Sequence, residues 1–238
     1  MVLRPRAARL DRSGTGGRPR GMRFRFALAL VAGLTSSLSV SAAELPKVLI
    51  LGDSISIGYT PEVTRLLAGQ AEVSRPKANC GSTQTGLANV EKWLGDGRWH
   101  VIHFNWGLHD LCYRHPDSKV QGNRDKVNGK QAVPPAEYER NLETLVARLQ
   151  RTGARLVFAN TTLVPEGEAG RFTGDEVKYN AIAERVMKRH GIPVNNLHAV
   201  SRAFGPELGK GPGDVHFTPA GYARLAAEVA AAVKRVAR

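Results

Sequence analysis

The stretch KVLILGDS, residues 47–54, decides the fold of this chain. The nearly continuous apolar run at its start is typical of a strand buried on both faces. Gly52 and Asp53 then end the run with residue types that favour turns and helix caps. The stretch therefore predicts a buried strand that turns directly toward a helix, with Ser54 exposed at the turn.

Strand-like and helix-like segments alternate from this stretch to the end of the chain. Further strands are expected at 71–75, 99–104, 155–160 and 192–195, and helices at 61–69, 87–94, 135–152, 173–190 and from 218 onward. The alternation predicts an α/β fold of flavodoxin-like type, a three-layer α/β/α sandwich with a central parallel sheet of about five strands. Residues 44–238 are expected to form one domain, since no internal repeat is visible.

The carboxyl ends of parallel strands are where such folds place their sites. Ser54 follows the first strand, and the segment 107–110 follows the strand expected at 99–104. Both should therefore lie on the same rim of the sheet. The polar, basic segment 113–134 is expected to be a lid or a flexible insertion near that rim.

Residues 1–43 have the character of a leader. They carry eight arginines against one acid, so much of the net charge of +13 lies outside the expected domain. A basic start at 22–25, an apolar stretch at 26–34 and small residues at 41–43 form a signal-peptide layout, with the mature chain starting near Glu44. Translation that begins at the second methionine would explain the Arg-, Gly- and Pro-rich residues before it. An uncleaved anchor is the weaker alternative, because the apolar part contains serines and a threonine.

The leader predicts an exported protein, periplasmic or secreted, with no stable membrane insertion after cleavage. A nucleic-acid partner is not expected, because no strip of interleaved aromatic and basic residues accompanies the positive charge. No feature of the sequence predicts an oligomeric state.

An acid and a base are available near the C-terminus, in Asp214-Val215-His216. A serine hydroxyl is a weak nucleophile that needs a general base, which in turn needs a group to orient it. Ser54, His216 and Asp214 together therefore suggest a serine hydrolase. Each motif is weak by itself, but their order and expected structural context agree.

At this point the chain resembles the GDSL or SGNH hydrolases, over roughly residues 46–236. Four short blocks carry the resemblance: Gly52-Asp53-Ser54, Gly81, Gly107-Leu108-His109-Asp110 and Asp214-Val215-His216. The third block departs from the family pattern Gly-x-Asn-Asp, because a histidine occupies the asparagine position.

The resemblance implies a role for each block. Ser54 is the nucleophile, His216 the general base and Asp214 the group that orients the imidazole. The backbone N–H groups of Ser54 and Gly81 bind the oxyanion, and His109 would complete the oxyanion hole. No cofactor and no metal ion are implied.

His109 leaves three interpretations open. It can donate to the oxyanion if the protonated ring nitrogen faces the pocket, because a neutral imidazole has one N–H donor. It can instead contact the substrate or serve a structural role. It can also signal lost catalytic competence, although the intact Ser54, Asp214 and His216 argue against this.

Two cysteines flank the proposed oxyanion residues, Cys80 before Gly81 and Cys112 after Asp110. Export permits a disulfide, and neighbouring loops on one rim would bring the thiols together. The alternative is two small buried side chains. Four histidines lie close in sequence: His100, His103, His109 and His115. A zinc site is not expected, because His100 and His103 fall on opposite faces of the expected strand and the spacing does not converge.

The sequence therefore predicts an exported serine ester hydrolase that forms an acyl-enzyme on Ser54. Its expected substrates are short-chain esters, such as O-acetylated carbohydrates or small-molecule esters. An O-acyltransferase that uses the same three residues is the nearest alternative. A non-catalytic glycan-binding module on the same fold is the alternative from a different functional class.

Overall fold

The computed structural model describes residues 44–238, so the predicted leader and signal peptide of residues 1–43 lie outside the described residues. The described chain has helices and strands in alternation, as expected. In chain order they are β1 (Lys47–Leu51), α1 (Ser54–Leu66), β2 (Glu72–Ser74), α2 (Thr83–Leu94), β3 (Val101–Phe104), β4 (Tyr113–Arg114), η1 (Gln121–Asn123), β5 (Lys130–Gln131), α3 (Pro135–Gln150), β6 (Arg155–Ala159), α4 (Asp175–Arg189), β7 (Val194–Asn195), α5 (Leu197–Arg202), η2 (Pro206–Leu208) and α6 (Pro219–Ala237).

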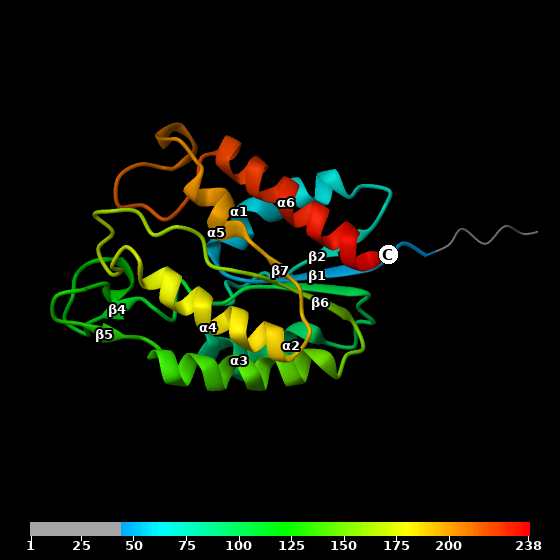
Figure 1. Cartoon of the computed structure of the whole chain (residues 1–238), viewed down its shortest axis with the longest axis horizontal. Coiled ribbons are helices and arrows are strands. Elements are labelled where there is room, and N and C mark those ends of the chain that lie inside the picture. The colour runs from blue at the N-terminus through cyan, green and yellow to red at the C-terminus, as the bar shows by residue number, and fades with distance from the viewer. Residues whose placement is uncertain (1–43) are drawn as a thin grey trace, which may run out of the picture. The chain divides into compact units, whose positions relative to one another are not determined.

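The central sheet has five strands in the order β2-β1-β3-β6-β7, and every neighbouring pair is parallel. Figure 1 shows α1 and α6 against one face of this sheet and α2, α3 and α4 against the other. The predicted three-layer α/β/α sandwich is therefore confirmed.

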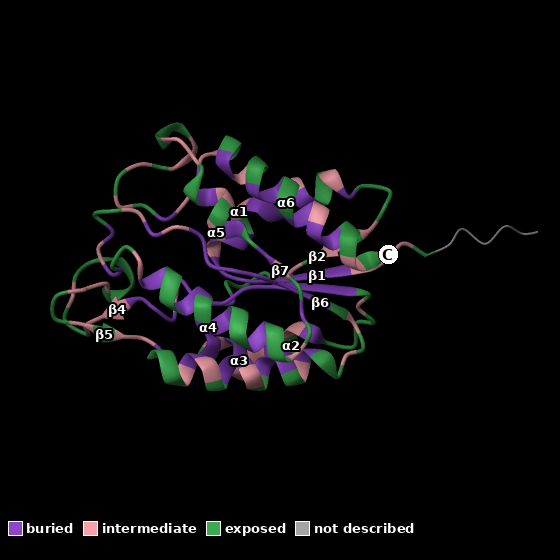
Figure 2. Ribbon diagram, in the orientation of Figure 1, coloured by how far each residue is buried: buried purple, intermediate pink, exposed green. Residues whose placement is uncertain are grey.

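The core lies on both faces of the sheet. Residues 48–51 of β1 are at most 2% exposed, as a strand covered by helices on both sides requires. Figure 2 shows β1 and β6 buried along most of their length, whereas the helices are buried mainly on the side that faces the sheet. The apolar run that opens the domain is thus part of its buried core, and it fixes the position of the turn that follows.

The first helix begins earlier than predicted, at Ser54 rather than at Pro61. The Asp53 side chain accepts a hydrogen bond of 2.9 Å from the backbone N–H of Ile55 and caps the helix. Pro61 lies inside the helix, although a proline is more often found at a helix start. The cap therefore decides the start, and Ser54 is the first residue of α1.

Caps also shift two other helices relative to the prediction. α2 begins at Thr83, because the Ser82 side chain accepts a hydrogen bond from the backbone N–H of Thr85. α4 begins at Asp175 with Gly174 at the cap position, two residues after the predicted start at 173. Gly174 has a φ of 94°, a left-handed conformation that a glycine adopts without strain.

The polar segment 113–134 has secondary structure of its own. β4 and β5 form a two-stranded antiparallel sheet, with Tyr113 opposite Gln131. At the base of this insertion the Ala132 N–H donates to the Cys112 carbonyl at 2.9 Å. The insertion is thus anchored to the rim of the sheet. The sequence predicted either a lid or a flexible insertion for this segment. The sequence predicted neither these strands nor the short α5, η1 and η2.

Within residues 44–238, no helix combines the length and the apolar character needed to cross a bilayer.

Candidate active site

Ser54, Asp214 and His216 meet at one rim of the sheet, although 162 positions separate Ser54 from His216. His216 Nε2 lies 2.9 Å from Ser54 Oγ, and His216 Nδ1 lies 2.6 Å from Asp214 Oδ1. A proton on Nδ1, directed at the carboxylate, leaves Nε2 free to accept the serine proton. The arrangement can therefore withdraw the proton of Ser54 Oγ as that oxygen attacks an acyl carbon.

A tight strand-to-helix turn holds Ser54 at the rim. Only Gly52 and Asp53 separate β1 from α1, and Ser56 Oγ donates to the Asp53 carbonyl at 2.7 Å. A Cβ atom at Gly52 would lie 2.9 Å from Ser56 Cβ, so the turn has no room for a side chain there. The nucleophile candidate thus lies at the start of a capped helix, at the carboxyl end of β1.

His216 lies in a loop that is tied back on itself before α6. The Lys210 N–H donates to the His216 carbonyl at 3.0 Å, and the Thr218 N–H donates to the Leu208 carbonyl at 2.9 Å. The Thr218 side chain then caps α6. Backbone hydrogen bonds on both sides therefore fix the direction in which the imidazole points.

Asp214 is held in its ionised form. Partial burial by itself would raise its pKa, but hydrogen bonds from the backbone N–H and the ring of His216, with nearby positive charge, bring the pKa below the usual value. The backbone N–H of His216 lies 2.9 Å from Asp214 Oδ1. The same carboxylate oxygen thus contacts the backbone and the ring of His216, which fixes the ring orientation.

The predicted oxyanion donors differ in availability. Ser54 is the first residue of α1, and its N–H has no acceptor within the described chain, as is usual for the start of a helix. The Gly81 N–H instead donates to Asn79 Oδ1 at 2.9 Å. Gly81 has a φ of 58°, so the left-handed backbone of this turn favours glycine. The exposed Asn79 side chain would have to leave before Gly81 could donate to a substrate.

His109 lines the same cleft as Ser54 and His216. Burial lowers its pKa, and the positive charges of Arg171 and Arg114 lower it further against the opposing effect of Asp53. The ring is therefore neutral near pH 7 and has a single N–H donor. Its place in the cleft is compatible with the oxyanion role, which remains a proposal.

Asp110 ties the third block to the start of α2. Its Oδ1 accepts from the backbone N–H of Thr83 at 2.8 Å and from Thr83 Oγ1 at 2.5 Å. Asn141 Nδ2 of α3 donates to the same hydroxyl at 3.0 Å. Burial raises the pKa of Asp110 to about 7, although the bonds from Thr83 oppose the shift. This network holds the His109 loop against the loop that carries Gly81.

The predicted disulfide is not formed, because Cys80 and Cys112 are both free and buried. Burial raises the pKa of the Cys80 thiol to about 11, against a hydrogen bond from Gly52 that lowers it. The Cys112 thiol donates weakly to the Tyr113 carbonyl at 3.6 Å and packs against Gly170. The two thiols thus have separate surroundings, and the structure has two small buried side chains here.

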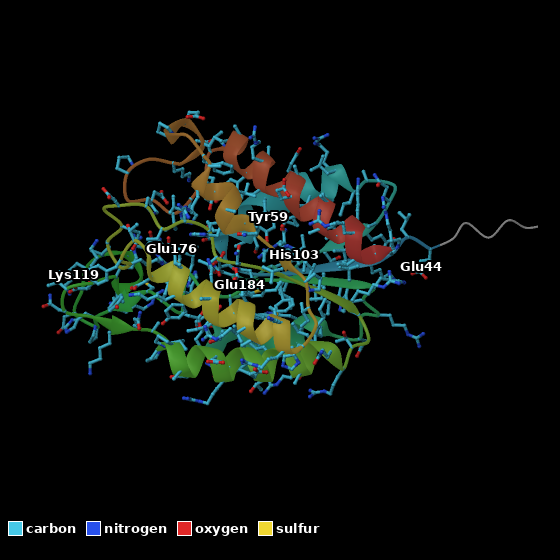
Figure 3. All side chains as sticks on the ribbon, in the orientation of Figure 1. Glu44, Tyr59, His103, Lys119, Glu176 and Glu184 are labelled. Atoms are coloured by element: carbon cyan, nitrogen blue, oxygen red, sulfur yellow. The ribbon has the colours of Figure 1, made fainter. Side chains whose placement is uncertain are left out.

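The histidines near the third block do not converge. His103 is fully buried, packs edge-on against Tyr59 at 6.1 Å between ring centroids, and lies with it near the middle of the fold (Figure 3). Burial lowers its pKa to about 4. His100 Nδ1 accepts from the Lys47 N–H at the other end of the strand. Within residues 44–238, no cluster of potential ligands could hold a metal ion.

Sequence reasoning missed Asn79 and three arginines of the same cleft. The cleft has a volume of about 450 Å³, and Ser54, His109 and His216 lie on its wall. Asn79 is signalled only by its position two residues before Gly81. The arginines are scattered through segments without a motif, so only the fold brings them together. They are Arg114, Arg124 and Arg171.

The sequence of the chain is similar to that of a known protein family. The family model described as "GDSL-like Lipase/Acylhydrolase family" matches residues 50–224, which is most of the chain. No match is found among curated protein sequences.

Solved structures with similar folds have low sequence identity. A lipase/acylhydrolase from Enterococcus faecalis has a TM-score of 0.65 at 18% identity, over 80% of this chain and 96% of that one. An acetyl xylan esterase has a TM-score of 0.64 at 17% identity, over 79% of this chain and 99% of that one. An acetyl xylan esterase from Geobacillus stearothermophilus has a TM-score of 0.61 at 15% identity, over 80% and 94%. At such identities the likeness shows the fold alone.

We expect His109→Asn to keep kcat/KM within about tenfold of wild type and His109→Ala to lower it by about 10²–10³-fold. Asparagine restores an N–H donor at the oxyanion position, whereas alanine removes it. Ester hydrolysis by the two variants, with circular dichroism to verify folding, measures the difference. Full activity in the alanine variant would exclude the oxyanion role.

Asp110 predicts a pH dependence of stability. Its native pKa of about 7 exceeds the ordinary value of 3.8, so the native state binds more protons than the unfolded chain and loses stability as pH rises between these values. His103 has a native pKa of about 4, below the ordinary 6.5, so it lowers the stability of the native state as pH falls between these values. The free energy of unfolding of Asp110→Asn, relative to that of wild type, should therefore rise by about 2–3 kcal/mol from pH 5 to pH 8, since one pKa unit corresponds to about 1.4 kcal/mol.

Urea unfolding of both proteins at the two pH values measures this difference. His103 is present in both, so its contribution cancels in the comparison. A difference that does not change with pH would show that Asp110 titrates in the native state as it does in the unfolded chain.

Proposed function

Because the chain belongs to the GDSL-like lipase/acylhydrolase family, we propose that it hydrolyses short-chain acyl esters through an acyl-enzyme on Ser54. The observation that carries the proposal is the continuous contact from Ser54 Oγ to His216 Nε2 and from His216 Nδ1 to Asp214. A base within hydrogen-bond distance of the nucleophile, itself oriented by a carboxylate, is the arrangement that this chemistry needs. Ester hydrolysis of the SGNH type is the activity of the family. The roles of Ser54, His216 and Asp214 and the short-chain substrate are what we propose for this chain.

In the first half-reaction, Ser54 Oγ attacks the acyl carbon and His216 Nε2 takes its proton. The carbonyl oxygen becomes an oxyanion, which the free Ser54 N–H at the start of α1 is placed to bind. His216 then gives the proton to the leaving alcohol oxygen as the carbon–oxygen bond breaks. The acyl group remains on Ser54.

In the second half-reaction, water attacks the acyl-enzyme and loses its proton to His216. The proton returns to Ser54 Oγ when the acid leaves. Asp214 stays ionised throughout, consistent with its lowered pKa, and stabilises the imidazolium that forms in each half.

His109 and Gly81 would complete the oxyanion hole. The neutral His109 ring supplies one N–H, and the Gly81 N–H becomes available when Asn79 turns toward solvent. Neither group needs a cofactor to act.

A short acyl group and a polar alcohol suit the cleft best. Its walls near Ser54 carry mainly polar and charged side chains. An apolar cavity of about 310 Å³, lined by Leu163, Phe204 and Phe217, adjoins the cleft at His216, but Ser54 is not part of its wall. The polar wall beside Ser54 therefore favours O-acetylated carbohydrates over long-chain lipids.

Hydrolysis of p-nitrophenyl esters with increasing acyl length tests this proposal. We expect kcat/KM to be highest for acetate or butyrate and to fall for octanoate and longer chains. Ser54→Ala should lose activity by about 10³-fold or more, because the nucleophile is gone. Values of kcat/KM that rise with acyl chain length would contradict the short-chain assignment. Unchanged turnover by Ser54→Ala would exclude Ser54 as the nucleophile.

We also propose export, which rests on the signal-peptide layout of residues 22–43. Expression of the full chain in a bacterial host, followed by cell fractionation and N-terminal sequencing, tests it. We expect a product outside the cytoplasm that begins near Glu44. A full-length product in the cytoplasmic fraction would contradict the prediction.

A further inference from the structure

Positive charge gathers on the wall of the cleft that faces Ser54. Arg114 and Arg124 come from the insertion of residues 113–134, and Arg171 comes from the loop before α4. The fold brings all three to the cleft that also contains Ser54 and His216.

The charges on this wall are only partly balanced. Glu168, which is fully buried, accepts from Arg124 Nη1 at 2.7 Å and from Arg171 Nη1 at 2.9 Å. One carboxylate thus serves two guanidinium groups. Arg114 has no ion pair with any carboxylate of residues 44–238, and its guanidinium donates to the Gly122 carbonyl. Excess positive charge therefore remains beside the nucleophile.

Arg171 is a fixed cation with an unused donor. It is 6% exposed, and its Nε donates to the Leu108 carbonyl at 2.7 Å. Its Nη1 is bonded to Glu168, whereas its Nη2 has no acceptor within the described chain. The ion pair with Glu168 holds the guanidinium in place, and the unused Nη2 donor can bind an anion that enters the cleft.

The effect of Arg114 and Arg171 on His109 agrees with an anion site on this wall of the cleft. Burial is the main cause of the lowered pKa of His109, and Asp53 opposes it. The positive charges of Arg171 and Arg114, with His216, add to the lowering. The two arginines are thus close to the centre where an ester would bind.

We propose that the cleft selects esters whose alcohol part carries an anionic group, a carboxylate or a sulfate, and that Arg114 and Arg171 determine this specificity. The proposal rests on the proposed function, because it names the substrate class of the same site. The leaving oxygen must face His216 Nε2 to receive its proton, so the alcohol part extends along the wall beyond His216. Guanidinium groups bind such anions with paired hydrogen bonds. An acylated acidic sugar fits this description.

Arg114 is the residue to test, because Arg124 and Arg171 also hold Glu168 and their removal would leave a buried carboxylate unpaired. Arg114→Gln removes the charge, and Arg114→Lys keeps it without the planar fork. Arg235→Gln is the matched control: Arg235 is exposed near the end of α6, and Figure 1 shows that end far from β4 and β5.

The experiment compares kcat/KM for para-acetoxybenzoate with its neutral counterpart para-acetoxybenzamide, and for para-acetoxybenzenesulfonate with para-acetoxybenzenesulfonamide. The anionic-to-neutral ratio in each variant, divided by that in wild type, cancels the intrinsic reactivity of each ester. We expect Arg114→Gln to lower the ratio about tenfold, as the loss of one charge-assisted hydrogen bond implies. Arg114→Lys should keep part of the preference, and Arg235→Gln all of it.

The two pairs of esters distinguish the sources of the anion. A loss in the carboxylate pair alone assigns a uronate-like substrate, and a loss in the sulfonate pair alone assigns a sulfated one. A ratio that Arg114→Gln leaves unchanged in both pairs, or lowers no more than Arg235→Gln does, overturns the proposal.

Binding to Ser54→Ala protein separates this outcome from failure of the proposed function. Equilibrium dialysis with para-acetoxybenzoate and para-acetoxybenzamide needs no turnover. Tighter binding of the anion, lost when Arg114→Gln is added, supports the site even if wild type hydrolyses neither ester. Equal binding of the two esters overturns it even if wild type is an active esterase.

Discussion

The hydrogen bond from the Ile55 N–H to Asp53 Oδ1 is the constraint on which the site depends. It caps α1 directly after β1, so the chain passes from a buried strand into a helix within two residues. Ser54 therefore occupies the first helical position, with its hydroxyl at the rim and its backbone N–H without an acceptor in the helix. The Asp53 cap therefore positions both the nucleophile candidate and one oxyanion donor.

The parallel sheet supplies the other half of the arrangement. Because the strands all run in one direction, the segments after β1 and β3 emerge at one edge and the loop before α6 returns to it. Local hydrogen bonds then lock each segment. Asp110 binds Thr83 across two loops, and backbone bonds on both sides of His216 direct its ring toward Ser54. The insertion adds arginines to the same edge, so catalytic and charged groups share one cleft.

Much of this was predictable from the sequence. The alternation of segments gives the fold class, and the apolar run gives the strand that carries Ser54. The positions of helix starts were not predictable from periodicity, because single polar side chains such as Asp53 and Ser82 decide them. The disulfide was predicted from closeness in the fold. Closeness of two loops does not fix the direction of their side chains, and the thiols of Cys80 and Cys112 lie in separate surroundings. The cluster of Glu168 and the arginines depends on residues brought together only by tertiary packing, with no motif in the sequence.

The central claim is that Ser54 is a nucleophile activated by His216, and covalent labelling tests it most directly. The folded protein is treated with a fluorophosphonate, and the adduct is located by intact mass and peptide mapping, alongside a His216→Ala variant. The account predicts a single adduct on Ser54 in the wild-type protein and labelling slowed by orders of magnitude in the variant. No adduct on Ser54, or equal labelling of the two proteins, would contradict it.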